Sequence, residues 1–385
     1  MTTPTPTPKN LEKIKQSSYI GISNLGNTCF LNSCIQVLFH TEDLFDIFYK
    51  KDNYSKIHDA NKNNNPKNYE DVFVTREWID IKRQMVAITD EKIRNVQSVQ
   101  FPKLYMDIRS FITLIHNVAQ KKNRLLFTGW SQNDLPEFLL FIVECFHNSI
   151  SREVTMTIQG NAQTEMDKTA VECYGLLKTI YEKEYSEIMN DFYGIYVSVI
   201  SSLGKHKIHT VKPEHFFLLD LPIPSLIVGK NVSLYDCFDL FTQTEILEKE
   251  NAWFNEKTNK KENIEKEIRF WNLPKILIIS LKRFSGGGGG ETIRKNNTFV
   301  DFPLDNLDLS KYIVGYGPSA YKYKLYGICN HYGNTEGGHY TSFVNTGQGR
   351  NIDEWTHFND ADVTVGNSTG IVTQSAYCLF YSRYS

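Results

Sequence analysis

The sequence has no pair of cysteines at C-x-x-C spacing, the spacing that redox and zinc-binding motifs use. Its seven cysteines are an odd number and are scattered over 385 residues. A secreted disulfide framework would show an even number of cysteines at regular spacings. We therefore expect free thiols and a reducing location inside the cell, either cytoplasmic or nuclear.

An excess of charge of one sign and long apolar runs are also absent. Lys and Arg number 42 and Asp and Glu number 44, so the formal net charge is −2, which argues against nucleic acid or an anionic membrane as the main partner. No stretch approaches the roughly 20 apolar residues that a membrane span needs, and the first residues lack the pattern of a secretory signal. Nothing in the sequence indicates an obligate oligomer, so we expect a monomer without nucleic-acid or membrane partners.

Proline, glycine and polar residues divide the chain into segments. Thr-Pro alternation favours an extended, flexible tail over residues 1–16, and the polar residues 50–68 indicate a loop. Gly286–Gly290 predict a flexible loop, because five glycines in a row hold neither a helix nor a strand. Residues 245–269 carry charge of both signs with almost no apolar periodicity, which indicates a solvated finger or helix surface.

The apolar pattern changes midway along the chain. In the first half, apolar residues recur every three or four positions, as in amphipathic helices. The second half contains short runs rich in β-branched and aromatic residues, which are typical of strands. Helices followed by strands predict an α+β fold in which a helical lobe faces a β-rich lobe, and a cleft between two such lobes is a common place for a site. The predicted strands are residues 192–200, 216–221, 275–283, 322–330, 339–345, 354–358 and 377–381.

Cys29 lies between a predicted turn and a predicted helix. Gly26 and Asn27 favour the turn, and an apolar helical pattern begins directly after Cys29. A thiol at a helix N-terminus faces the positive end of the helix dipole, which favours the nucleophilic thiolate. A small buried cysteine at the start of a core helix would give the same pattern, so this position alone does not assign a role.

A thiol nucleophile needs a base, and the base needs a group that orients it. Among ten histidines, His339 follows two glycines at the start of a predicted strand, where glycines let a substrate backbone approach closely. Farther along, Asn359 or Asp360 could accept a hydrogen bond from the imidazole. The order Cys, His, then Asn or Asp is that of papain-like thiol hydrolases, although a chain of this length also contains it by chance.

Several longer segments together resemble the ubiquitin-specific proteases, a family of cysteine proteases that remove ubiquitin. The similarity extends over roughly residues 18–384, and its segments occur in the order that the family shows. They are a cysteine box at Tyr19–Ser33, the segments Gln132–Leu139, Leu219–Pro224 and Leu273–Phe284, and a histidine box at Tyr326–Gly333, Gly337–Ser342, Trp355–Asp360 and Ala376–Tyr381.

The resemblance implies a thiol-dependent deubiquitinase that acts on ubiquitin and ubiquitinated proteins through an acyl-enzyme. It needs no metal or organic cofactor. The side-chain amide of Asn24 would be well suited to stabilise an oxyanion, because one such donor typically contributes about 10²–10³ in rate. By this resemblance the site residues are the nucleophile Cys29, the base His339, its orienting residue Asn359 with the assisting Asp360, the oxyanion donor Asn24, and Asp134 and Tyr340 as contacts of the ubiquitin tail.

The resemblance also implies a papain-like α+β fold described as a hand with thumb, palm and fingers. The catalytic domain would occupy residues 17–385, with the fingers at about residues 192–275. Cys29 would lie on the helical thumb and His339 on the antiparallel, β-rich palm, with the ubiquitin tail threaded between them.

Two features depart from the family pattern. Many members bind structural zinc in the fingers through two C-x-x-C pairs, but residues 198–204 and 253–257 contain no cysteine, so we predict no zinc. The inserted residues 346–353 leave open whether Asn359 or Asp360 is the main group that orients His339.

Two alternatives to a deubiquitinase also stay open. One is a weakly active or inactive pseudoprotease that binds ubiquitin, although Cys, His and Asn or Asp are all present. The other is an isopeptidase for a different ubiquitin-like modifier, because a channel for a Gly-Gly tail would serve either substrate.

Overall fold

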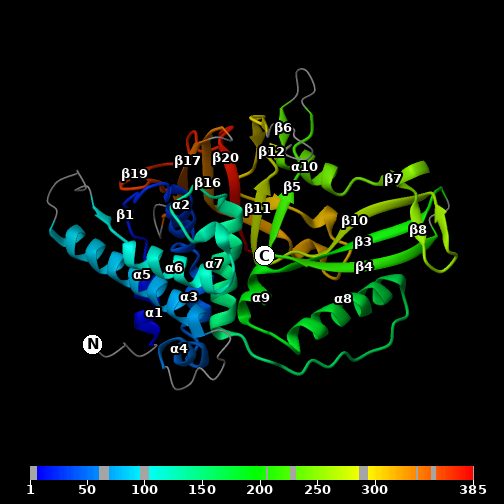
Figure 1. Cartoon of the computed structure of the whole chain (residues 1–385), viewed down its shortest axis with the longest axis horizontal. Helices are drawn as coiled ribbons and strands as arrows, with labels where there is room; N and C mark the ends of the chain where they lie inside the picture. The colour runs from blue at the N-terminus through cyan, green and yellow to red at the C-terminus, as the bar shows by residue number, and fades with distance from the viewer. Residues whose placement is uncertain are drawn as a thin grey trace.

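The computed structural model describes residues 7–59, 69–95, 104–204, 207–225, 231–285, 294–334, 337–347 and 353–384, with the backbone alone described for 91–95. These residues form a helical lobe and two larger sheets, one next to the helices and one that extends away from them (Figure 1). The predicted glycine loop Gly286–Gly290 lies outside the described residues.

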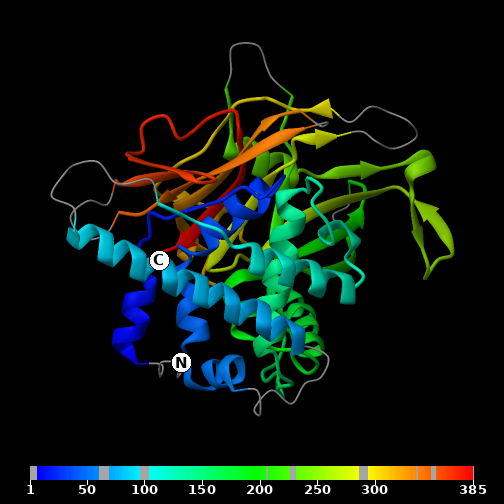
Figure 2. The same cartoon turned by 60° about the vertical axis from the view of Figure 1, so that its left-hand side comes forward.

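The helical lobe comprises the first part of the chain, drawn in blue to cyan in Figure 1. Helix α2 packs against both α7 and the large sheet, and all ten of its residues are buried. A helix that is buried on every side must be apolar all round, and the sequence CFLNSCIQVL largely meets that demand. The long helix α5 crosses the lobe diagonally (Figure 2). The helices are α1 (Pro8–Lys15), α2 (Cys29–Leu38), α3 (Glu42–Phe48), α4 (Lys51–His58), α5 (Tyr69–Asn95), α6 (Arg109–Lys121) and α7 (Leu135–Ile150).

The large sheet, within the described residues, has the strand order β19-β18-β17-β16-β20-β11-β5, with β15 paired to β16. Its pairs are antiparallel except β11 with β5. Every residue of β11 is buried, as expected for a strand covered on both faces. The strands are β5 (Leu218–Leu221), β11 (Ile276–Leu281), β15 (Leu307–Asp308), β16 (Lys322–Gly333), β17 (Gly338–Asn345), β18 (Trp355–Asn359), β19 (Asp362–Gly366) and β20 (Ala376–Arg383).

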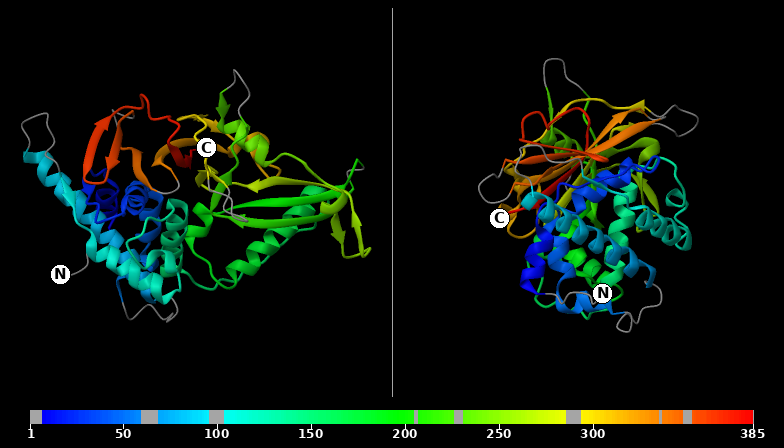
Figure 3. Two further views of the ribbon diagram at one scale, coloured as in Figure 1. Left: turned by 45° about the horizontal axis from the view of Figure 1, so that its top comes forward. Right: turned by 90° about the vertical axis from the view of Figure 1, so that its left-hand side faces the viewer.

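The second sheet forms the fingers and has the order β4-β3-β10-β7. It extends away from the body of the molecule, and α8 (Glu165–Tyr181) lies along one face (Figure 3). Ala170 and Cys173 of α8 are buried in one apolar cluster with Val197 and Trp271 of the sheet. The strands are β3 (Gly194–Ser202), β4 (Ile208–Phe216), β7 (Glu245–Leu247) and β10 (Ile264–Asn272). At the tip, β8 (Trp253–Asn255) and β9 (Lys260–Glu262) form a separate two-stranded sheet.

The remaining elements are short and connect these parts. No helix among the described residues has the length and apolar character needed to cross a membrane. The connecting elements are β1 (Gly21–Ile22), β2 (Tyr105–Met106), η1 (Leu125–Phe127), α9 (Glu187–Phe192), β6 (Val232–Ser233), α10 (Leu234–Phe241), η2 (Lys249–Asn251), β12 (Phe284–Ser285), β13 (Arg294–Lys295), β14 (Val300–Asp301), η3 (Ser310–Tyr312) and η4 (Pro318–Ala320).

The α+β prediction is confirmed, and each of the seven predicted strands overlaps an observed one. Two predictions were wrong. Residues 8–15 of the expected tail form α1, because the Thr7 side chain caps the helix, Pro8 suits its first turn and Ile14 is buried. Residues 51–58 of the expected loop form α4, whose few apolar residues, Tyr54 and Ile57, are buried.

Candidate active site

A tight turn places Cys29 at the first position of α2. Gly26 (φ 103°) and Asn27 (φ 58°) are both left-handed, a conformation that glycine and asparagine tolerate best. The side-chain oxygen of Asn24 closes the turn, since it accepts hydrogen bonds from the backbone N–H groups of Gly26 (3.0 Å) and Thr28 (3.3 Å). The predicted turn followed by a helix is therefore confirmed.

The surroundings of Cys29 raise the pKa of its thiol. Cys29 is only 3% exposed, and burial is the main cause of the raised pKa. The backbone N–H of Tyr340 opposes this effect, the carboxylate of Asp360 adds to it, and N–H groups at the start of α2 lower the pKa somewhat. The helix start therefore does not lower the pKa of Cys29 overall, contrary to the expectation from the sequence. Burial thus favours the neutral thiol over the thiolate, so a base that takes the proton would assist a reaction at Cys29.

His339 lies at the start of β17 and is oriented by Asn359 at the end of β18. The Nε2 atom of His339 is 2.6 Å from Oδ1 of Asn359. An amide oxygen only accepts hydrogen bonds, so Nε2 carries the proton and Nδ1 keeps a lone pair. This tautomer leaves Nδ1 available as a base.

Asp360 faces a different partner. Its backbone is left-handed (φ 51°). Its carboxylate accepts hydrogen bonds from the amide groups of Asn24 (2.9 Å) and Asn32 (2.7 Å). In the structure, therefore, Asn359 contacts His339, and Asp360 contacts Asn24 and Asn32.

The two halves of the site meet where β17 begins. The backbone N–H of Tyr340, the residue after His339, interacts with the thiol of Cys29, and α2 packs on β17. Across the described ranges, no hydrogen bond joins the Cys29 thiol directly to the His339 ring. Without bound substrate such catalytic hydrogen bonds are often long, and they tighten in the substrate complex.

Asp134 and Tyr340, the two predicted contacts of the substrate tail, bond to each other. The Tyr340 hydroxyl donates to Oδ1 of Asp134 at 3.2 Å, and Tyr377 donates to the same carboxylate at 2.9 and 3.0 Å. Burial raises the pKa of Asp134, while the two tyrosine hydroxyls lower it. The rings of His331 and Phe284 pack beside these tyrosines, so the carboxylate sits in a largely aromatic wall next to His339.

Sequence reasoning missed two residues at this site. Tyr377 shares Asp134 with Tyr340, and Gln132 bonds to the backbone of Gly338. Both lie inside segments that carry the family resemblance, which was the available signal. Neither has a residue type that by itself indicates a site.

No metal site accompanies this arrangement. In the part of the chain that the structure describes, no group of three or more His, Cys, Asp or Glu side chains could hold a metal ion. At the fingertip, Glu262 accepts hydrogen bonds from Asn255 (3.0 Å) and Thr258 (2.6 Å), and His209 bonds to Ser202 (2.7 Å). The lack of structural zinc stays a prediction, and these side chains are not a set of zinc ligands.

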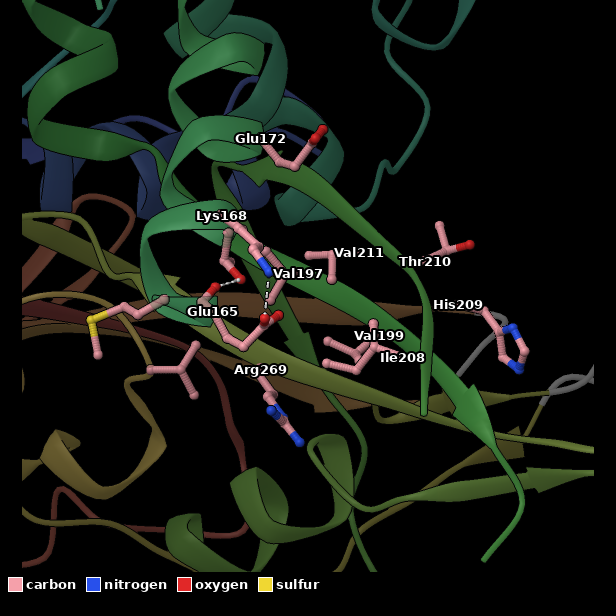
Figure 4. Close-up of a pocket in the computed structure, with 13 residues that line it drawn as sticks. Glu165, Lys168, Glu172, Val197, Val199, Ile208, His209, Thr210, Val211 and Arg269 are labelled. Carbon is pink, nitrogen blue, oxygen red and sulfur yellow. Dashed lines mark hydrogen bonds and ion pairs between the residues drawn. The ribbon is translucent and has the colours of Figure 1, made fainter. Parts of the chain in front are cut away.

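A cavity of about 470 Å³ lies elsewhere, between α8 and the fingers sheet. Its floor includes Val197, Val199 and Val211, and Lys168 at its rim pairs with Glu165 (Figure 4). None of the predicted site residues lines this cavity. The cavity and the candidate active site therefore lie in different parts of the molecule.

The fold, with a cysteine at a helix start beside a His–Asn pair on two strands, is that of the papain-like cysteine hydrolases. Residues 20–381 match the family model described as ubiquitin carboxyl-terminal hydrolase. The match covers nearly the whole chain, so the chain belongs to the ubiquitin carboxyl-terminal hydrolase family, and the resemblance to ubiquitin-specific proteases is confirmed.

Similar proteins include ubiquitin carboxyl-terminal hydrolases 2 and 21 of Homo sapiens. The first is 30% identical over an alignment of 372 positions, which covers 95% of this chain and 55% of the relative. The second is 29% identical over an alignment of 387 positions, which covers 95% of this chain and 61% of the relative. The chain thus spans somewhat more than half the length of these relatives.

A solved structure shares the fold. It is the SAGA DUB module of Ubp8, Sgf11, Sus1 and Sgf73 bound to monoubiquitin, with a TM-score of 0.66 and 23% identity. The likeness covers 97% of this chain and 70% of that chain.

Proposed function

We propose that this chain is a thiol deubiquitinase that hydrolyses the isopeptide or peptide bond after the C-terminal glycine of ubiquitin. The observation that carries the proposal is the His339–Asn359 pair, which leaves a basic Nδ1 at the strand start that lies against Cys29. Family membership supports this function, as do the names of the relatives and the monoubiquitin bound to the SAGA DUB module.

In the first half of the reaction, Nδ1 of His339 takes the proton of the Cys29 thiol. The thiolate attacks the carbonyl carbon of the terminal glycine and forms a tetrahedral oxyanion. The oxyanion collapses, His339 gives its proton to the leaving lysine amine, and the C–N bond breaks. Ubiquitin is then held on Cys29 as a thioester.

In the second half, a water molecule replaces the amine. His339 takes a proton from this water, and the resulting hydroxide attacks the thioester carbonyl. When the C–S bond breaks, the sulfur recovers the proton through His339, and ubiquitin leaves with a free carboxylate. Asn359 keeps the imidazole in the tautomer with the proton on Nε2, so that Nδ1 faces the chemistry in both halves.

Asn24 would stabilise the oxyanion. One N–H of its amide bonds to Asp360 at 2.9 Å and its oxygen accepts two backbone N–H groups, so the amide plane is fixed and its second N–H has a set direction. A fixed donor is worth more than a mobile one, because it needs no reorganisation as charge develops. Asp360 then acts as a positioning residue for Asn24, and not as the residue that orients His339.

The aromatic wall beside His339 suits an extended peptide tail. Asp134 is held by Tyr340 and Tyr377 at the start of α7, so its carboxylate could accept backbone N–H groups of a passing chain. A tail that ends in two glycines suits close packing against this wall, because glycine lets neighbouring backbones approach closely. The same wall would accept other modifiers with a Gly-Gly end.

The test is hydrolysis of ubiquitin that carries a C-terminal fluorogenic amide. We expect the wild type to release the fluorophore and Cys29→Ala to fall to background, since removing a catalytic nucleophile typically costs about 10⁶ in kcat. Cys34→Ala, which removes a buried thiol of the same helix, is the matched control and should stay active. Ubiquitin binding without cleavage by the wild type would contradict the proposal and indicate a pseudoprotease. Cleavage of other modifiers alone would identify a different isopeptidase.

A further inference from the structure

The side chain of Gln132 forms two hydrogen bonds with the backbone of Gly338, the residue before His339. Nε2 of Gln132 donates to the Gly338 carbonyl at 3.0 Å, and the Gly338 N–H donates to Oε1 of Gln132 at 3.2 Å. The amide thus pairs with Gly338 as a neighbouring strand would. Gln132 comes from the segment before α7 (Leu135–Ile150), and Gly338 is the first residue of β17.

Among the described residues, β16 is the one strand that pairs with residues 338–341 of β17. β18 pairs with β17 only from Ser342 to Asn345, so the outer edge of residues 338–341 extends beyond it. The Asn334 N–H bonds to the Gly337 carbonyl, and hydrogen-bonded positions alternate in an antiparallel pair, so the N–H and C=O of Gly338 face that outer edge. Gln132 forms hydrogen bonds with both of these backbone groups.

The inner side of Gly338 is closely packed. A Cβ atom added there would lie 2.1 Å from Nε2 of His331, whose ring is buried against Tyr340. Gly338 is therefore confined on one face by the His331 ring and on its free edge by Gln132. Together these contacts fix the backbone from which His339 projects.

Gln132 also reaches the turn that carries the nucleophile. Nε2 of Gln132 is 3.5 Å from Oδ1 of Asn27, and Asn27 in turn donates to the Trp130 carbonyl at 3.0 Å. Asn27 is two residues before Cys29. One side-chain amide therefore touches both halves of the site, the turn before the nucleophile and the strand of the base.

We propose that Gln132 is a positioning residue that sets the alignment of His339 with Cys29. The inference rests on the proposed thiol hydrolase function. It acts through the Gly338 backbone, because a shift of that backbone carries the imidazole with it. Alignment matters strongly for catalysis, since a misplacement of about 1 Å can lower the rate about 10²-fold. Binding of the ubiquitin domain, by contrast, does not depend on this alignment.

The test compares Gln132→Ala and Gln132→Glu with the wild type on ubiquitin fluorogenic amide. Glu keeps the shape and the acceptor oxygen but has no N–H for the Gly338 carbonyl. We expect kcat to fall at least about tenfold in both variants, with KM changed less than about twofold. Asn133→Ala is the matched control, because within the described residues the Asn133 side chain bonds to the carbonyl of Ser131, and we expect both constants to stay unchanged.

A second readout separates positioning from substrate binding. In a Cys29→Ala background, Gln132→Ala should leave the Kd for ubiquitin within about twofold of the parent. A rise in KM and Kd with kcat unchanged would overturn the inference and make Gln132 a substrate contact. A rise in kcat/KM would overturn it as well, because Gln132 would then block the channel. Inactivity of the wild type itself would instead refute the proposed function.

Discussion

The proposed nucleophile Cys29 and the proposed base His339 are held by different forces. Every residue of α2, which starts with Cys29, is buried, so core packing fixes the nucleophile. His339 and Gly338 are only half-buried, at the start of β17, which extends beyond β18, and hydrogen bonds of His339 with Asn359 and of Gly338 with Gln132 hold this part of the strand. We therefore expect substitutions in the core around α2 to change stability. Substitutions around His339 should change activity alone.

The largest expected effect comes from removing the base. We expect His339→Ala to lower kcat/KM roughly 10⁴- to 10⁶-fold while the free energy of unfolding changes by less than about 1 kcal/mol. Its matched variant is Ile35→Val on α2, which removes one fully buried methyl group and should cost about 0.5–1.5 kcal/mol with near-normal activity. Kinetics and thermal unfolding of both variants check the comparison. A large loss of stability in His339→Ala would contradict the expectation that substitutions around His339 change activity alone.

A smaller effect is expected at Asn24, the proposed oxyanion donor. It lies in the turn before Cys29 and bonds to Asp360, the residue after Asn359. Asn24→Ala removes the amide and should lower kcat about 10²–10³-fold. Asp360→Asn keeps a residue that tolerates the left-handed backbone, but an amide offers only one oxygen to the two amide donors that Asp360 now accepts. It should lower kcat by a smaller factor.

The double variant tests whether these two residues act as one unit. If Asp360 acts only by holding Asn24, the losses will not add, and the double variant will match Asn24→Ala. Additive losses in kcat would show that Asp360 acts independently of Asn24.

Much of this site could be predicted because its residues lie in long sequence segments. Cys29, His339 and Asn24 each stand in a run of matched residues, so one segment suggests both the residue and its role. The choice between Asn359 and Asp360 could not be made from sequence. They are neighbours, and only the folded structure shows that Asn359 bonds to His339 while Asp360 bonds to Asn24 and Asn32.

The fold was hardest to predict where apolar periodicity is weak. β4 and β10 of the fingers were not predicted, because β4 has only one fully buried residue and β10 only three, so neither shows a clear apolar face. Gln132 could not be recognised either, since its partner is a backbone group 206 residues away. Local patterns identify which residues form elements, but contacts between distant segments decide how the base is held.

The smallest expected effect concerns Lys82, a buried lysine in the helical lobe that also contains Cys29. Lys82 of α5 is fully buried, its Nζ bonds to the Gln16 carbonyl at 2.9 Å, and it lies close enough to His40, just beyond α2, to lower the pKa of that histidine. Burial lowers the pKa of Lys82 from 10.5 to about 7. Between these two values the unfolded chain binds the proton and the folded protein does not, so stability falls as the pH drops from 10.5 to 7.

Lys82→Met should therefore raise the free energy of unfolding near pH 7.5 by about 1–2 kcal/mol, even though the bond to the Gln16 carbonyl is lost. It should also flatten the rise of stability between pH 7 and pH 10, and leave kcat/KM unchanged. Lys168→Met, which removes an exposed lysine, is the control and should change stability by less than about 0.5 kcal/mol. Chemical denaturation across this pH range measures both variants. If Lys82→Met is less stable than the wild type and its stability changes with pH in the same way, Lys82 is charged in the folded state. The helical lobe that carries Cys29 would then depend on a buried charge as well as on packing.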